Sequence, residues 1–193
     1  MLSDIAAESE RLLGIVENLL LLTKLESGVL PDPEPQVIAH VVRTTVESFQ
    51  RRHRERVIRL ESEPRHLIVE ADRPYLELLL DNLISNAHKY SPVHEPIEVV
   101  VTSTERDAEV RVLDRGIGLQ DTDSERLFTA FYRAGQAKAH TAGLGIGLAA
   151  CRRVAEALGG RTWAGPRQGG GSEFGFALPL APEPDITELV QIH

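Results

Sequence analysis

The opening segment, residues 1–27, carries hydrophobic side chains at helical spacing, which predicts an amphipathic helix. The apolar stripe consists of Ile5, Leu12, Ile15, Val16, Leu19 and Leu22. Gly28 marks the expected end of the helix, and three prolines in the stretch LPDPEP prevent it from continuing. We therefore expect a linker over residues 28–36. Periodicity alone leaves two interpretations open: the helix packs on the domain that follows, or it is a separate helical segment.

Residues 37–86 combine helical and strand patterns. The stretch VIAHVVRTTVESFQRRHRERV has a helical period, whereas VIRLES and HLIVEAD are short and strand-like. Asp72 followed by Pro74 is typical of a helix start, because aspartate caps free backbone N–H groups and proline fits the first turn. A helix is therefore predicted from this point through Asn86.

The chain from residue 97 to residue 180 adds hairpins around one more helix. IEVVVTSTERDAEVRVLD alternates like two antiparallel strands joined by the polar turn ERDA, and RTWAGP and SEFGFALPL are joined by RQGGG. A helix is expected from about Gly145 to Leu158. Hairpins separated by helices predict an α+β fold, a two-layer sandwich with a mixed sheet and helices on one face, preceded by one amphipathic helix. The last residues, 181–193, are expected to form a tail.

Composition narrows the possible functions. A chain of 193 residues can form one sizeable domain with an appendage, and its formal net charge of −8 argues against binding to nucleic acid. The single cysteine, Cys151, cannot form an internal disulfide. The apolar run Leu19–Leu22 is far shorter than the roughly 20 residues that span a bilayer, and the N-terminus does not resemble a signal peptide. These features indicate a cytoplasmic location.

Two asparagines in the stretch DNLISNAHKYS are candidates for metal binding. Asn82 and Asn86 are four residues apart and therefore share one helix face. The simpler interpretation is that both are surface residues. An amide oxygen is a suitable ligand for Mg²⁺, however, and Lys89 and Tyr90 on the next turn offer a charge for phosphate and an aromatic ring.

Two glycine-rich turns add a second and a third candidate segment. In DRGIGL, Asp114 can accept a hydrogen bond from an exocyclic amine, and Gly116 and Gly118 allow close approach of a ligand, although a plain strand-exit turn has the same pattern. GLGIGL precedes a helix whose N-terminus can hold an anion. A loop-like stretch precedes it, and no Gly-Lys-Ser/Thr ending follows, which excludes a Rossmann motif and a P-loop.

The order of these motifs resembles a known family. DNLISNAHKYSP, DRGIGL, RLFTAFYR, GLGIGL and GGGSEF are similar to the N, G1, F, G2 and G3 boxes of the catalytic ATP-binding domain of bacterial sensor histidine kinases, within the gyrase, chaperone and MutL superfamily. The resemblance covers residues 37–180 and implies a Bergerat-type fold. The opening helix is similar to the second helix of the dimerisation and phosphotransfer hairpin of that family.

The resemblance implies a role for each motif residue. Asn86 would ligate Mg²⁺ with Asn82 nearby, while Lys89 and Arg133 would approach the phosphates of ATP. Asp114 would hold the adenine amino group, and Phe128 and Phe131 would anchor a mobile lid. The residues expected to contact the nucleotide are Tyr90, Asp114, Gly116, Gly118, Phe131, Gly143, Leu144, Gly145, Gly147, Leu148 and Ser172.

The same resemblance favours a kinase over an ATPase. Asn82 stands where the ATPase branch has a glutamate general base, and an amide cannot take a proton from water at neutral pH. No histidine of this chain stands in a phosphoacceptor context. We therefore expect Mg-ATP to donate its γ-phosphate to a histidine on a dimerisation helix outside this chain.

Further partners and an alternative function also follow from the resemblance. The implied partners are ATP, a phosphoacceptor helical hairpin of the same or another kinase chain and a downstream response regulator. The full-length protein is expected to be a homodimer, with or without a membrane anchor. The alternative is an ATP-binding regulatory module, either a pseudokinase or an anti-sigma-like serine kinase, that acts through partner contacts.

Overall fold

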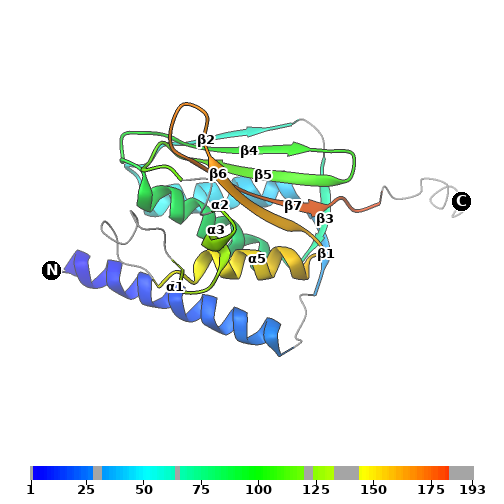
Figure 1. The fold of residues 1–193 in the computed structure, drawn as a ribbon, viewed down its shortest axis with the longest axis horizontal. Helices are drawn as coiled ribbons and strands as arrows, with labels where there is room; N and C mark the ends of the chain where they lie inside the picture. The colour runs from blue at the N-terminus through cyan, green and yellow to red at the C-terminus, as the bar shows by residue number, and fades with distance from the viewer. Residues whose placement is uncertain (1, 28–31, 64–65, 120–123, 133–143, 183–193) are drawn as a thin grey trace, which may run out of the picture.

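The computed structural model describes residues 2–27, 32–63, 66–119, 124–132 and 144–182. Figure 1 shows a β-sheet as one layer, a layer of helices beneath it and the N-terminal helix on the far side of those helices. The elements in chain order are α1 Leu2–Glu26, β1 Glu34–Val37, α2 Ile38–Arg52, β2 Ile58–Ser62, β3 Ile68–Ala71, α3 Arg73–Tyr90, β4 Ile97–Ser103, β5 Asp107–Leu113, the 3₁₀ helix η2 Arg126–Phe128, α5 Gly147–Ala157, β6 Arg161–Pro166 and β7 Ser172–Pro179.

The main sheet has five strands in the order β2-β4-β5-β7-β6. β2 pairs with β4 in parallel, and the other neighbours are antiparallel. Buried and partly exposed positions alternate along β4 and β5, which is the pattern of strands with one face on a core. Helices α2, α3 and α5 cover that face. The predicted α+β sandwich with a mixed sheet and helices on one face is therefore confirmed.

Helix α3 carries the predicted signals at its start and contributes a large part of the core. The Asp72 side chain accepts a hydrogen bond from the Tyr75 backbone N–H at 3.3 Å, which satisfies one free donor of the first turn. One face of the helix is fully buried. The residues on this face are Leu76, Leu79, Leu80, Leu83, Ile84 and Ala87. Asn82 and Asn86 lie outside this face and are half-buried, so the core does not cover them.

The structure differs from the sequence expectation at β1 and at the end of α2, and α3 continues to Tyr90, beyond the expected Asn86. Glu34–Val37, of which all but the last residue lies in the expected linker, forms β1 and pairs with β3 in a second, two-stranded sheet. Proline in this stretch does not prevent pairing because an edge strand tolerates a missing N–H donor. Helix α2 ends at Arg52, although the helical period continues to Val57. The residues after Arg52 instead turn inward and bring Arg56 into the interior.

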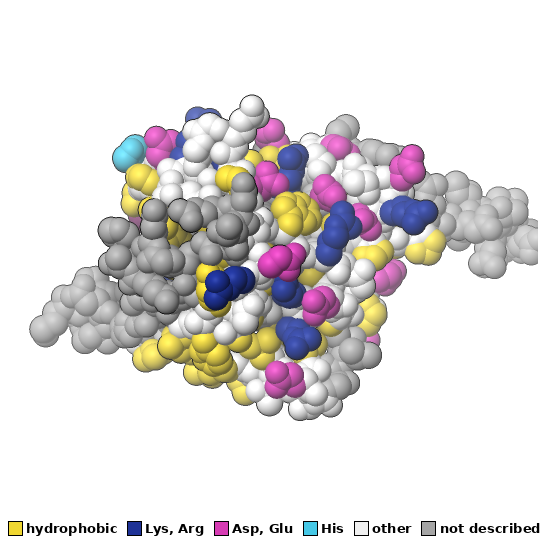
Figure 2. Space-filling model, viewed as in Figure 1, with side chains coloured by type: hydrophobic (Ala, Val, Ile, Leu, Met, Phe, Trp, Pro, Cys, Tyr) yellow, Lys and Arg dark blue, Asp and Glu magenta, His cyan; other side chains and the backbone are white. Residues whose placement is uncertain are grey.

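Helix α1 contacts the helical layer on one side only. Leu21 is buried, and Asn18 is only 8% exposed. Figure 2 shows apolar side chains gathered along the lower edge of the molecule, over α1. They are 41 to 59% exposed and comprise Leu12, Leu13, Val16, Leu19 and Leu20. Within the described residues, no helix combines the length and apolar character that crossing a bilayer requires.

Candidate functional site

The end of α3 meets the turn that follows β5. The Ile117 backbone N–H donates a hydrogen bond to the Tyr90 carbonyl at 3.3 Å. A Cβ on Gly116 would lie 2.1 Å from the same carbonyl oxygen, so only glycine permits this approach. Two of the three segments singled out in the sequence, DNLISNAHKYS and DRGIGL, therefore meet at Tyr90.

Asp114 is held at the base of this turn. It is 1% exposed, and its Oδ1 accepts hydrogen bonds from the backbone N–H groups of Gly116 at 2.7 Å and Ser172 at 3.3 Å. The Ser172 side chain also hydrogen-bonds the carboxyl group. Because a carboxylate has about four acceptor positions, one position remains for a further donor. This buried acceptor suits the exocyclic amine of an adenine base.

Burial controls the ionisation of Asp114. Loss of solvation raises the pKa of the carboxyl group, while the hydrogen bonds from Gly116 and Ser172 and the charge of Arg167 partly oppose that rise. Arg167 also donates to the Asp114 carbonyl at 3.4 Å and pairs with Glu98 at 2.6 Å. The hydrogen bond from Arg167 lowers the pKa of Glu98. Arg167 therefore ties the turn to β4.

The two asparagines of α3 have different surroundings. Asn86 is half-buried, and its amide has no hydrogen-bond partner in the described part of the chain, so its oxygen can still ligate a cation. Asn82 instead exchanges hydrogen bonds with Asn18 of α1, donating at 2.9 Å and accepting at 3.4 Å. Nothing in the sequence pattern pairs residues 18 and 82, so this contact could not be predicted from it. One helical turn after Asn86, the Lys89 side chain lies over the Tyr90 ring, with Nζ 5.4 Å from the ring centroid.

The third segment, GLGIGL, lies beside the same helix. Gly145 has a φ of +71° and accepts a hydrogen bond from the Phe131 N–H at 3.0 Å. Helix α5 begins at Gly147, where an added Cβ would lie 2.8 Å from Asn82 Oδ1. Leu144 is exposed, and Leu148 packs against the core. The N-terminus of α5 therefore lies beside α3 at Asn82.

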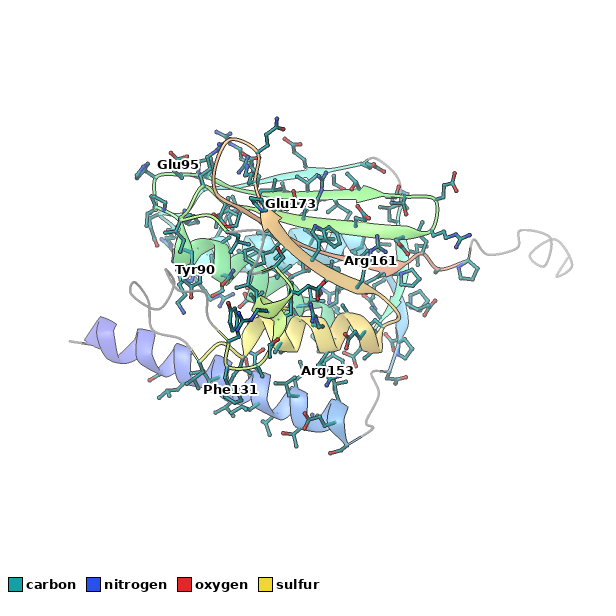
Figure 3. The ribbon with its side chains drawn as sticks, viewed as in Figure 1. Tyr90, Glu95, Phe131, Arg153, Arg161 and Glu173 are labelled. Carbon is teal, nitrogen blue, oxygen red and sulfur yellow. The ribbon has the colours of Figure 1, made fainter. Side chains whose placement is uncertain are left out.

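The aromatic residues of RLFTAFYR behave differently from one another. Phe128 is buried in η2, with the Arg152 guanidinium 4.8 Å from its ring centroid. Phe131 is 70% exposed and has a φ of +65°. An anchoring role therefore fits Phe128, whereas the exposed ring of Phe131 does not support one, and its anchoring role stays a prediction. Figure 3 shows Phe131 and Tyr90 toward the same end of the molecule. The expected contacts of Arg133 and Gly143 lie outside the described residues.

The Asn18–Asn82 pair should couple α1 to the domain. Replacing either residue by alanine should cost about 1–3 kcal/mol in free energy of unfolding, because a partly buried amide loses its partner. The double substitution Asn18→Ala with Asn82→Ala should cost clearly less than the sum of the two single substitutions. Urea unfolding of the four proteins measures this coupling. Strictly additive costs would show that the amide pair contributes nothing to the packing of α1.

Comparisons with known proteins agree with this geometry. The family described as histidine kinase-, DNA gyrase B-, and HSP90-like ATPase matches residues 71–182. The sensor histidine kinase WalK of Bacillus subtilis (strain 168) is 33% identical over 91% of this chain and 30% of its own length. The structure of full-length ShkA in complex with AMPPNP has a TM-score of 0.76 and 25% identity, over 93% of this chain and 38% of ShkA.

A third relative was solved with a partner protein. Histidine kinase ThkA, in complex with the response regulator protein TrrA, has a TM-score of 0.74 and 24% identity over 93% of this chain and 50% of that chain. The chain thus spans half or less of the length of each of these three relatives. The family match covers more than half of the 193 residues of the chain. The chain therefore belongs to the histidine kinase-, DNA gyrase B- and HSP90-like ATPase family, and within that family it is similar to the catalytic ATP-binding domain of sensor histidine kinases.

Proposed function

We propose that this chain binds Mg-ATP and presents its γ-phosphate to a histidine on a helical hairpin that lies outside the chain. The observation that carries the proposal is the buried Asp114 carboxylate, which keeps an acceptor position and lies at a turn that only glycine can form. The end of α3 lies beside this turn, and the start of α5 lies beside α3 at Asn82. This arrangement would recognise the base through its amine and would leave the phosphates toward α3 and the start of α5.

One set of residues would bind the adenine of ATP, and a second set would bind its phosphates and the metal ion. Asp114, Gly116 and Ser172 would hold the adenine, with Tyr90 beside it. Lys89 would reach the phosphates, and the box from Gly143 to Gly147, together with Leu144 and Leu148, would close over them. Asn86 would hold Mg²⁺, which when bound neutralises negative charge on the β- and γ-phosphates.

The chemistry is an in-line phosphoryl transfer. An imidazole nitrogen of the partner histidine uses its lone pair to form the new P–N bond while the bond from the γ-phosphorus to the bridging oxygen breaks. ADP leaves with that electron pair, and the proton on the other ring nitrogen passes to solvent. The chain contributes positioning and charge neutralisation to this step. Asn82 cannot act as a general base toward water, and its amide is already bonded to Asn18, which favours transfer over hydrolysis.

The exposed apolar side of α1 supports an assignment of this helix to a dimerisation and phosphotransfer hairpin. We infer that residues 1–27 are the second helix of the hairpin, that residues from 37 to 180 form the ATP-binding domain and that a response regulator receives the phosphate. The parent protein would then be a homodimer whose catalytic part works in the cytoplasm. The complex of ThkA with TrrA supports this kind of partner by analogy.

A transfer assay tests the proposal. The chain is incubated with Mg²⁺, ATP labelled on the γ-phosphate and a histidine-bearing hairpin expressed from the same gene. We expect acid-labile label on the hairpin. Tight ATP binding without labelled histidine would favour an ATP-binding regulatory module that acts through partner contacts. Absence of ATP binding would overturn both assignments.

Asn86→Ala should weaken nucleotide binding only when magnesium is present. The substitution removes the proposed metal ligand and leaves the adenine end of the pocket unchanged. Calorimetric titration with ATP, with and without Mg²⁺, should show that the gain in affinity from the metal falls about tenfold or more, equivalent to about 1.4 kcal/mol. Ser85→Ala, an exposed neighbour on the same helix, is the control. A full magnesium effect in Asn86→Ala would remove Asn86 from the metal site.

A further inference from the structure

Arg56 is a charged side chain inside the protein. It is 2% exposed and is the largest of the fully buried side chains. Burial lowers its pKa, which reflects the cost of removing a guanidinium from water. A charge in this position needs strong compensation. In the described part of the chain, the side-chain hydrogen bonds of Arg56 all go to one short segment, residues 88–95, and the charges of Glu55 and Asp114 also favour its protonated form.

The guanidinium makes six hydrogen-bond contacts with this segment through its five N–H groups, so one N–H of Nη1 is shared between two acceptors. Nε donates to His88 Nδ1 at 3.0 Å, and Nη2 donates to the carbonyls of His88 and Ser91 at 2.9 Å each. Nη1 donates to Ser91 Oγ at 3.2 Å and to the carbonyls of Pro92 and Glu95 at 2.7 and 2.8 Å. None of these acceptors is a carboxylate. The planar fork therefore serves to fix the backbone of the segment.

The segment that Arg56 holds is the C-terminal end of α3 and the turn after it. The last carbonyls of a helix have no partner within the helix, and the helix dipole favours a positive charge beside them. Arg56 supplies both hydrogen bonds and charge from a loop 32 residues away in the sequence. Lys89 and Tyr90 belong to the last turn of α3, which is fixed in this way. The position of this turn therefore depends on Arg56.

The same turn positions the adenine end of the site. The Tyr90 carbonyl accepts the Ile117 N–H and lies against Gly116, which in turn donates to Asp114. We propose that Arg56 is a positioning residue of the nucleotide site: through the end of α3 it fixes Lys89, Tyr90 and the turn after Asp114. This inference rests on the proposed function for its consequence in binding, but its structural part holds without nucleotide.

A metal site does not explain this cluster as well. Possible ligand atoms of His53, Glu55 and His88 lie within 4.8 Å of one another. His88 Nδ1, however, accepts the hydrogen bond from Arg56, so its neutral ring carries the proton on Nε2. A metal ligand must offer a lone pair and usually donates its other N–H group to an acceptor. Arg56 also places a positive charge beside the histidine.

The experiment compares Arg56→Met with Arg54→Met. Arg54 is exposed in the same loop, so the two variants lose the same charge. Amide resonances of the unliganded proteins are recorded under conditions in which each is fully folded, and ATP affinity is then measured with Mg²⁺. In Arg56→Met we expect the Gly116 and Ile117 resonances to shift and ATP affinity to fall at least tenfold. Arg54→Met should match the wild type in both measurements.

The resonances of folded Arg56→Met test whether Arg56 positions the turn after Asp114. Folded Arg56→Met with wild-type Gly116 and Ile117 resonances would overturn the inference, because a loss of stability alone does not move the resonances of the folded form. If Arg56→Met does not fold, Arg56→Lys decides in the same way, since lysine keeps the charge but cannot reproduce the planar fork. Resonance shifts in a protein whose wild type does not bind ATP would overturn the proposed function and leave the positioning role in place.

Discussion

Asp114→Asn should weaken ATP binding about 10–100-fold while leaving the unliganded protein at least as stable as the wild type. The asparagine oxygen can still accept the N–H groups of Gly116 and Ser172. Its amide nitrogen is a donor, however, and would face the donor amine of adenine. An unpaired buried group costs about 1–3 kcal/mol, which corresponds to the expected loss in affinity. Calorimetric titration with ATP measures it, and Asp32→Asn on the exposed surface is the control for charge.

The stability of the same variant should depend on pH in a defined direction. Burial raises the pKa of the Asp114 carboxyl group on folding. A carboxyl group whose pKa is raised on folding stabilises the folded state when the pH is below its pKa in the unfolded chain. This stabilisation disappears as the pH rises through its pKa in the folded protein. Asparagine does not titrate. The stability of Asp114→Asn relative to wild type should therefore increase from acidic to neutral pH in urea unfolding. The opposite trend would show that ionised Asp114 stabilises the fold.

Gly171→Ala should destabilise the protein about 1–3 kcal/mol more than Gly170→Ala does. Both glycines have left-handed backbones, with φ of +96° and +98°, so alanine adds similar backbone strain at each position. At Gly171 the new Cβ would lie 2.1 Å from the Asp114 carbonyl oxygen, whereas at Gly170 nothing lies within 4 Å. The extra cost is overpacking against backbone, which cannot move aside without moving Asp114.

Denaturant unfolding of the two alanine variants measures this difference directly. Gly171→Ala should also lower ATP affinity more than Gly170→Ala, because the displaced Asp114 backbone carries the carboxyl group that we assign to adenine recognition. Equal losses of stability in the two variants would show that the turn after β6 adapts to the added methyl group and does not fix Asp114.

The sequence was sufficient to predict the features that depend on local signals. The cap at Asp72, the alternating strands around ERDA and the glycines of DRGIGL predict structure within a few residues of themselves, and each element formed at the expected place. Contacts between distant residues could not be predicted in this way. β1 needs β3 as a partner, and the Asn18–Asn82 pair joins residues 64 positions apart. No period or spacing records such a pairing.

Arg56 shows the same limit for a single side chain. In the stretch HRER it has the composition of a solvated surface loop, and the sequence analysis gave it no role. Its burial depends on the carbonyl groups at the end of α3, which become available only when that helix ends at Tyr90. A buried arginine can therefore be identified only once the helix end and the loop are placed together in three dimensions.

The reciprocal amide contact between α1 and α3 bears on how shortened versions of this protein are interpreted. A version that begins after residue 27 lacks Asn18, so the Asn82 amide would turn to solvent, and the space beside Gly147 would open. Nucleotide affinity and turnover measured on such a fragment would describe a site in which Asn82 and Gly147 have different surroundings. Values from fragments with and without the first helix are therefore not interchangeable.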